Sequence, residues 1–195
     1  MTLRFCTDTS AADWLVHTGT PPFQLITLGP AGYAAYARLR FIPDPTRPGQ
    51  AEADAGITAE WPSEISQARR ALLQLLDFTA TPDDCYFCLW DGYSGTFQTP
   101  ELTRGPLVSI PYRRYALFSG PLADIQTWEQ DFGGGLPCPP PAFVWPADHR
   151  WCFASDVDPH WAGIGAEPAA IDRLVHDPDI DVVRAEPDVP APAYR

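Results

Sequence analysis

The chain has 195 residues, the length of one domain that can bury a core without disulfides or metal. It carries 25 acidic residues against 13 basic ones, all of them arginine, for a formal net charge of −12. Nucleic acids and anionic membranes attract cationic proteins, so this balance argues against both and favours a basic protein as the partner. A hydrophobic fraction of 45% excludes wholesale disorder, and 23 prolines with 14 glycines favour a fold rich in strands and loops.

Hydrophobic periodicity and turn residues predict the following elements in chain order. We expect a strand at residues 3–6, a short helix at 10–16, strands at 23–28 and 33–42, a long mobile loop at 43–59, a helix at 62–78, and strands at 85–90, 107–110 and 112–118. A second set follows, with a helix at 122–131, a loop at 133–141, strands at 143–145, 151–157 and 161–164, a helix at 169–176 and a closing strand at 180–183.

Two patterns are clearest. In residues 62–78, apolar side chains recur at three- and four-residue spacing, which is typical of an amphipathic helix. In residues 33–42, apolar side chains alternate with Arg38 and Arg40, which is typical of a strand. We expect residues 23–28, an apolar run, to pair with this strand as a hairpin.

Strands in succession with helices between groups of them indicate an α+β fold around a mostly antiparallel sheet. We expect a single domain over residues 1–185, with three to four helices packed on the sheet, and a flexible Pro/Ala-rich tail over residues 186–195. The first residues are too few and too polar for a signal peptide, and no apolar run reaches the length of a membrane helix. We therefore expect a cytoplasmic protein with reduced cysteines.

A metal or redox site is the first possibility that the cysteines raise. Cys85 and Cys88 have the spacing of a ligand pair, and His149 and Cys152 would complete a set of four. However, residues three apart on a strand face opposite sides of a sheet, and no glycine turn accompanies the pair. We therefore interpret these cysteines as buried structural thiols, expect no cofactor, and keep the metal site as a minor alternative.

Acidic, imidazole and indole side chains gather most densely around the predicted strand at residues 151–157. Our candidate partner-binding residues are Asp148, Asp156, Asp158, Trp161, Trp145 and Tyr93. In this interpretation the acids pair with a partner's basic side chains beside aromatic anchors. The alternatives are a general acid/base pair or a two-carboxylate metal site at Asp156 and Asp158, or acids that only cap turns at a strand end.

Two adjacent arginines, Arg113 and Arg114, lie between tyrosines on a predicted strand and face opposite sides. We expect one of them to pair with a carboxylate or to stack on a neighbouring ring. The glycine run at residues 133–135 is followed by Leu and Pro instead of a helix start, so it fails as a phosphate-binding loop.

Three segments carry distinctive motifs: DDCYFCLWDGY at residues 83–93, RRYALFSGPL at 113–122, and WPAD…WCFASDVD…W within 145–161. Together they resemble a family of small acidic proteins from high-GC actinobacteria that has no established activity. Residues 36–40 also match, although family members carry His-Pro soon afterwards where this chain has Ile42-Pro43. The resemblance implies a lineage and a cytoplasmic setting. By analogy only, some small acidic proteins of this kind look like antitoxins or immunity proteins.

The leading hypothesis from the sequence is a non-catalytic protein-binding module, in its most concrete form an immunity or antitoxin-type inhibitor of a more basic protein such as a toxin. The alternative is a small metal-dependent or acid/base hydrolase centred on Asp156, Asp158, His149 and His160. A third possibility is a small-molecule pocket lined by Trp90, Trp145 and Trp151. No nucleophile motif is present, so we lean toward the binding module.

Overall fold

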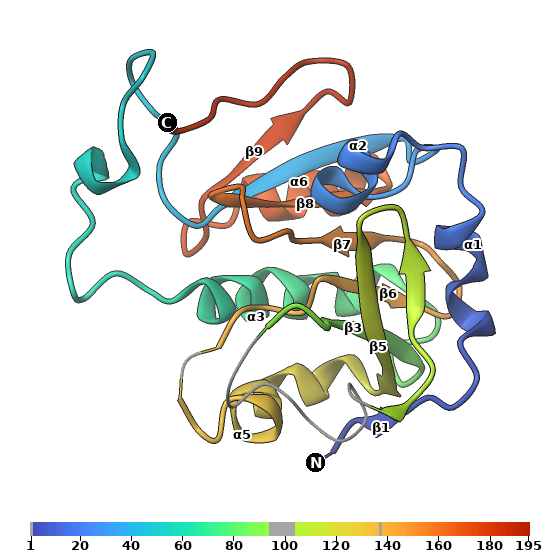
Figure 1. The fold of residues 1–195 in the computed structure, drawn as a ribbon. Helices are drawn as coiled ribbons and strands as arrows, with labels where there is room; N and C mark the ends of the chain where they lie inside the picture. Colours follow the sequence, from blue (N-terminus) through green and yellow to red (C-terminus); the bar gives the residue numbers. More distant parts are fainter. Residues whose placement is uncertain (1, 94–103, 137) are drawn as a thin grey trace.

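A computed structural model describes residues 2–93, 104–136 and 138–195 of the chain. Within them, nine strands form one antiparallel sheet in the order β1-β5-β3-β6-β7-β8-β2-β9, with β4 beside β5 (Figure 1). The strands are β1 (Arg4–Phe5), β2 (Ala35–Arg40), β3 (Cys85–Trp90), β4 (Val108–Ile110), β5 (Arg113–Gly120), β6 (Phe143–Pro146), β7 (Cys152–Ala154), β8 (Trp161–Ala166) and β9 (Val182–Ala185).

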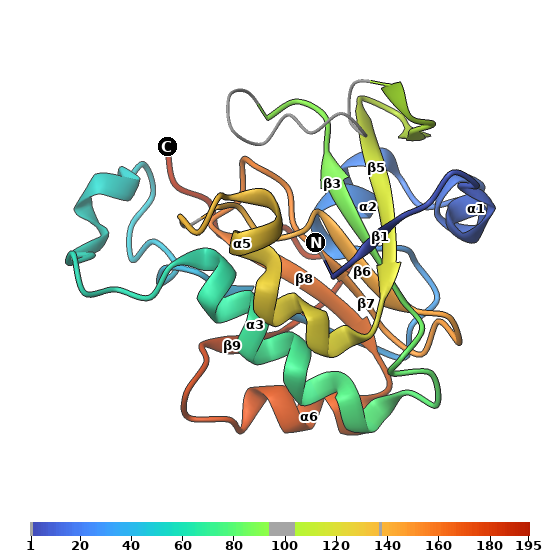
Figure 2. The ribbon, with the colours of Figure 1, turned by 90° about the horizontal axis from the view of Figure 1, so that it is seen from below.

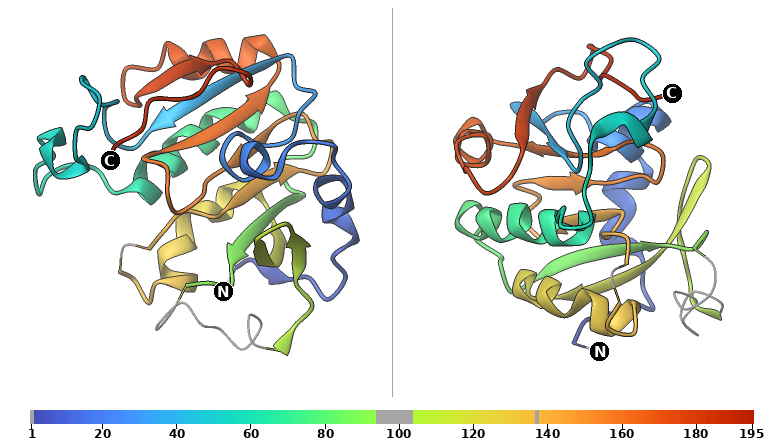
Figure 3. Two further views of the ribbon diagram at one scale, coloured as in Figure 1. Left: turned by 45° about the horizontal axis from the view of Figure 1, so that its top comes forward. Right: turned by 90° about the vertical axis from the view of Figure 1, so that its left-hand side faces the viewer.

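Helices cover both faces of this sheet (Figures 2 and 3). The α-helices are α1 (Asp13–Val16), α2 (Pro22–Leu28), α3 (Glu64–Gln74), α5 (Trp128–Phe132) and α6 (Pro168–Val175). Short 3₁₀ helices are η1 (Ser10–Ala12), η2 (Glu52–Ala55), η3 (Leu75–Phe78) and η5 (Leu122–Thr127). The chain is thus an α+β single domain, as the sequence predicted, although five α-helices pack on the sheet instead of three to four.

Alternation along β3 separates the two cores. Cys85, Phe87 and Leu89 belong to the core that α3, α5 and α6 cover, whereas Cys88 belongs to the core beneath α1 and α2. Both cores are apolar, so the sheet is buried on both sides over most of its width. Such a sheet supplies a rigid base for the loops at its ends.

The hairpin expected at residues 23–42 is wrong. Its first half is the helix α2, and β2 pairs instead with β8 and β9. Pro22 occupies the first helical position, where its missing N–H has no helical partner to lose, and Gly29 ends the helix at φ 94°. Because α2 buries nearly all of its last four residues, its apolar run lacks the polar face that marks an amphipathic helix.

A glycine in β8 sets how closely α2 lies on the sheet. A Cβ atom at Gly163 would stand 2.3 Å from the Cα atom of Leu28, which is too close for any side chain. This contact holds α2 against β8 and leaves Phe23, near the start of the helix, exposed at the surface.

The remaining elements lie close to their expected places. The expected strand at residues 85–90 coincides with β3, the expected helix at 62–78 becomes α3 followed by η3, and that at 122–131 becomes η5 followed by α5. The closing strand is β9, which begins two residues later than predicted. Across the described residues, no helix combines the length and apolar character needed to cross a bilayer.

Candidate functional site

The loop at residues 155–160, between β7 and β8, brings part of the predicted site together. Asp156 near its start accepts two hydrogen bonds of 2.9 Å from Arg113, through Nε and Nη2. The guanidinium carbon of Arg113 lies 5.1 Å from the centroid of the Trp90 ring, and the ring of Tyr93 stands edge-on to Trp90 with centroids 5.0 Å apart. The expectation that one of the two arginines pairs with a carboxylate or stacks on a ring is confirmed for Arg113, which does both.

Charge pairing dominates the chemistry of this cluster. The side chain of Asp156 is only 6% exposed, and its hydrogen bonds are the main reason that the pKa of Arg113 is raised. Burial raises the pKa of Tyr93 as well, so its phenol stays protonated. A carboxylate held in this way by an arginine serves as a charge partner and is poorly placed to exchange protons with a substrate.

Farther along the loop, Asp158 and Trp161 meet at a hollow. Asp158 has a side chain that is 79% exposed and lies 3.8 Å from Arg113. Trp161 begins β8 and is almost fully buried. Both side chains line one cavity of about 460 Å³, so the structure brings these two predicted residues to one place.

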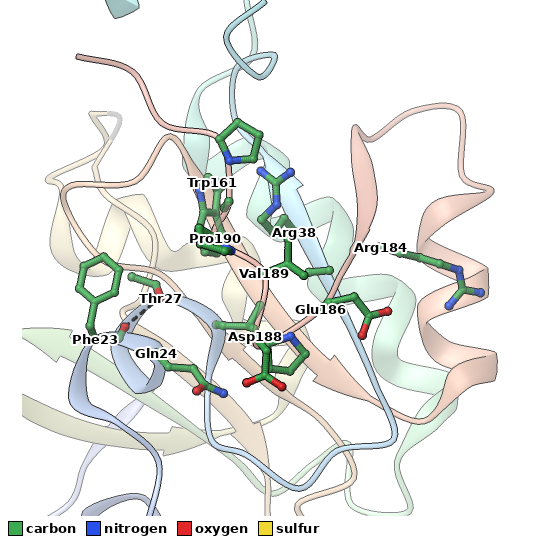
Figure 4. A pocket seen from close by; sticks show the side chains of 15 residues that line it. Phe23, Gln24, Thr27, Arg38, Trp161, Arg184, Glu186, Asp188, Val189 and Pro190 are labelled. Atoms are coloured by element: carbon green, nitrogen blue, oxygen red, sulfur yellow. Dashed lines mark hydrogen bonds between the residues drawn. The ribbon is translucent and has the colours of Figure 1, made fainter. Parts of the chain in front are cut away.

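A second cavity, of about 470 Å³, adjoins the first. The two share Phe23, Trp161, Pro190, Ala191 and Pro192, and we call the combined hollow the groove. Figure 4 shows Trp161 and Arg38 above Pro190, with Phe23 and Gln24 of α2 on the left and Glu186 on the right. Residues 186–195, which we call the C-terminal segment, thus run across the groove. Their expected flexibility stays a prediction.

Beneath the groove lies a network of charges centred on Asp44. Its carboxylate accepts hydrogen bonds from Arg38 (2.8 and 2.9 Å) and Arg40 (3.1 Å), and its Oδ1 lies 3.0 Å from Nε2 of His160. Burial raises the pKa of Asp44, but these hydrogen bonds outweigh it and hold the pKa well below its usual range. Arg38 also lies over the ring of Trp161, with its guanidinium carbon 5.4 Å from the centroid. The arginines and the carboxylate beneath the groove thus compensate each other's charge.

The rim of the groove is mainly acidic. Four of its lining residues are exposed acids: Glu52, Asp158, Glu186 and Asp188. Three are arginines, of which Arg38 pairs with Asp44 and Arg184 pairs with Asp172. The apolar part of the rim is exposed too, with Phe23 at 70% and Val189 at 65%. An apolar hollow with acids around it suits an apolar side chain that has basic side chains beside it.

The other predicted residues lie elsewhere. Asp148 accepts hydrogen bonds from Ala80 N (2.7 Å) and the Thr79 hydroxyl (2.9 Å), which cap the turn that follows η3. Burial raises the pKa of Asp148, but the hydrogen bonds outweigh this and lower it. Trp145, expected as a surface anchor, is fully buried, where it packs between Trp14 and Tyr86. It therefore stabilises the core and presents no surface to a partner.

The alternative metal ligands are dispersed. Cys85 belongs to one core, Cys88 and Cys152 belong to the other, and His149 stacks on Trp14 with ring centroids 4.3 Å apart. Burial raises the pKa of Cys85 to about 12, as expected for a buried structural thiol. Among the described residues, no three His, Cys, Asp or Glu side chains gather where a metal ion would bind.

The hydrolase alternative is brought together only in part, because Asp158 and His160 line one half of the groove whereas Asp156 and His149 line neither half. Asp156 pairs with Arg113, His160 with Asp44, and His149 with Trp14, so the proposed acids and bases have separate partners. Trp145 and Trp151 are fully buried, and with Trp90 they line neither half of the groove.

Sequence reasoning missed Phe23, Arg38 and the C-terminal segment, which line the groove, and Asp44, which lies beneath it. The spacing of Arg38 and Arg40 places both on one face of β2, which was a usable signal for a shared acidic partner. Their partner Asp44 lies beyond the end of the strand in a loop, where no periodicity marks it.

Comparison of the chain with family models, with curated proteins and with solved structures found no match.

Proposed function

We propose that the chain is a non-catalytic protein-binding module and that the groove receives an apolar group of a more basic partner. The observation that carries the proposal is the exposed ring of Phe23, which stands at the mouth of a hollow with Trp161 on its floor. Phe23 and the exposed Val189 line the same apolar hollow, and contiguous exposed apolar surface of this kind is typical of an interaction site.

The distribution of negative charge also favours a basic partner protein. The chain has a net charge of −12, and exposed acids such as Asp158 and Asp188 stand around the groove. Acids at the rim of an interface mainly raise the association rate of a basic partner, while a desolvated aromatic anchor slows its dissociation. We therefore expect affinity to depend on Phe23 and the salt dependence of association to depend on the acids.

The state of the local acids and imidazoles favours binding over catalysis. Asp156 and Asp44, the two most enclosed acids near the groove, are each held by arginine. His160 faces Asp44 on one side and the ring of Tyr194 on another. Inhibition of a basic protein, as by an immunity protein, is the most concrete form of this proposal.

Selection from a library of random displayed peptides tests the proposal without knowledge of the partner. We expect the enriched peptides to be basic and to contain an aromatic or aliphatic anchor. Phe23→Ala should weaken their binding about tenfold or more, and Asp158→Lys should slow their association and flatten its salt dependence.

Leu136 offers a matched control, because it is an apolar side chain of similar exposure (68%) that lines neither half of the groove. Leu136→Ala should leave peptide binding unchanged. Failure to enrich any peptide, or equal binding by the Phe23→Ala and wild-type chains, would contradict the proposal.

A further inference from the structure

The C-terminal segment already occupies part of the groove. Pro190 and Pro192 line both of its halves, and Ala191 between them packs against the cluster of Leu28, Tyr36 and Trp161. The segment continues to the loop at residues 43–59, which lies beside the end of the chain in Figure 1. The groove therefore has an intramolecular occupant whose chemistry can be read from its contacts.

Two residues anchor the far end of the segment. The Tyr194 hydroxyl donates a hydrogen bond of 2.5 Å to the Pro43 carbonyl, and its ring meets the His160 imidazole edge-on. The Arg195 N–H donates to the Gln50 carbonyl at 3.0 Å, and Arg195 lines the half of the groove that contains Glu52 and Asp158. The order along the segment is proline, any residue, proline, any residue, aromatic, basic.

The segment is held weakly along its middle. Proline has no N–H, so Pro190 and Pro192 lie in the groove with no backbone donor that needs a hydrogen-bond acceptor there. Within the described residues, the backbone hydrogen bond that joins the segment to the loop at residues 43–59 is the one at Arg195. Cavities of about 470 and 460 Å³ also remain beside the prolines, so the segment leaves much of the groove unfilled.

We propose that the groove is a binding site for an extended, proline-containing segment of the partner protein, with an aromatic and a basic residue after the prolines, and that the chain's own C-terminal segment competes for it. This inference rests on the proposed function. Extended proline-containing peptides dock well on aromatic side chains because little conformational entropy remains to be lost. The acids Glu52 and Asp158 line the same half of the groove as Arg195, and their charge suits the basic residue of such a ligand.

Binding of a labelled peptide in trans tests the competition. The probe has the sequence of residues 187–195 with a fluorophore at its N-terminus, and its anisotropy is followed as chain is added. Tyr194→Ala removes both contacts of the Tyr194 side chain and should raise the apparent affinity of the full chain for the probe about tenfold. Tyr194→Phe keeps the ring contact and should give a smaller increase.

Two controls make the result specific. A probe with alanine in place of Pro190 and Pro192 should bind the Tyr194→Ala chain at least about fivefold more weakly, because its unbound state is more flexible. Adding Phe23→Ala to the Tyr194→Ala chain should also weaken binding of the probe that keeps its prolines. Melting temperatures of the variants check that the domain stays folded, as expected for changes at one surface groove.

Equal binding of the probe to wild-type and Tyr194→Ala chains, or equal binding of the two probes, would overturn the inference. Dimerisation of the Tyr194→Ala chain, seen by sedimentation, would also overturn it, because the occupant would then be the segment of a second copy. A result that refutes the proline-containing ligand can be distinguished from one that refutes the proposed function. Displayed basic peptides that need Phe23 but lack proline would leave the binding module standing and refute the proline-containing ligand alone.

Discussion

The ring of Tyr194 stands edge-on to the imidazole of His160, with ring centroids 4.8 Å apart. His160 in turn faces Asp44, which Arg38 holds through two hydrogen bonds. Arg38 lies over the ring of Trp161 in the floor of the groove. An unbroken series of contacts thus connects the end of the C-terminal segment to the aromatic floor of the proposed binding site.

The Asp44 network should stabilise the fold. Asp44→Asn removes the negative charge and leaves Arg38 and Arg40 without their shared partner. We expect the free energy of unfolding to fall by about 2 kcal/mol, because Arg38 is then a buried cation that lacks its carboxylate. Urea denaturation followed by tryptophan fluorescence measures the change.

The same network makes stability depend on pH in acid. The pKa of Asp44 is lower in the folded chain than its usual 3.8, so the unfolded chain binds the proton first. The stabilisation is complete above the usual value and disappears as pH falls below it. The wild-type chain should therefore lose stability between about pH 5 and pH 2 more steeply than Asp44→Asn does. Parallel curves for the two chains would refute this assignment.

The pair of Arg113 and Asp156 should contribute more than a surface ion pair. Arg113→Met leaves a carboxylate that is only 6% exposed without its cation, and should lower the free energy of unfolding by about 3 kcal/mol. Arg47→Met is the matched control, since Arg47 pairs with Asp54 at a site where its side chain is 70% exposed. It should change stability by less than about 0.5 kcal/mol. Similar losses for both variants would show that burial of the first pair adds nothing.

Close packing of α2 on β8 should require a glycine. Gly163→Ala places a Cβ atom against the backbone of Leu28 and should lower the free energy of unfolding by about 1–3 kcal/mol. Gly19→Ala is the control, because a Cβ atom at Gly19 would meet nothing within 4 Å. Equal thermal stability of the Gly163→Ala and wild-type chains would mean that α2 shifts freely on the sheet.

The five cysteines should differ sharply in reactivity. Cys6 is half-buried and the other four are buried, and burial raises the pKa of both Cys85 and Cys138 to about 12. A thiol reagent at mildly alkaline pH should therefore modify Cys6 first and the others only after unfolding. Mass spectrometry measures the number of modified thiols over time. Rapid modification of a second thiol in the native chain would contradict this order.

The sheet could be predicted well because most of its strands are short apolar runs bounded by turn residues. The buried run of β3 was placed to the residue, and the two arginines of β5 were assigned to opposite faces. The helix α2 was mistaken for a strand because a short helix that is buried almost all round shows no polar face. Proline at its start and Gly29 at its end were the local signals that distinguish it.

The candidate site was only partly predictable, because its residues meet through tertiary contacts. Asp156 and Asp158 were recognised, and their shared loop with Trp161 made them neighbours in sequence. Phe23 joins them only because α2 docks on β8, and Pro190 only because the C-terminal segment folds back across the sheet end. Neither of these tertiary contacts is marked by a periodic pattern in the sequence.

Nuclear magnetic resonance mapping of a bound, display-selected basic peptide shows directly whether the groove binds a partner. We expect the indole N–H signal of Trp161 and the backbone signals of Phe23 and Asp158 to shift as peptide is added, while those of Tyr112 on the exposed β4–β5 turn stay in place. Shifts confined to the β4–β5 turn, with Trp161 unchanged at saturation, would contradict binding at the groove.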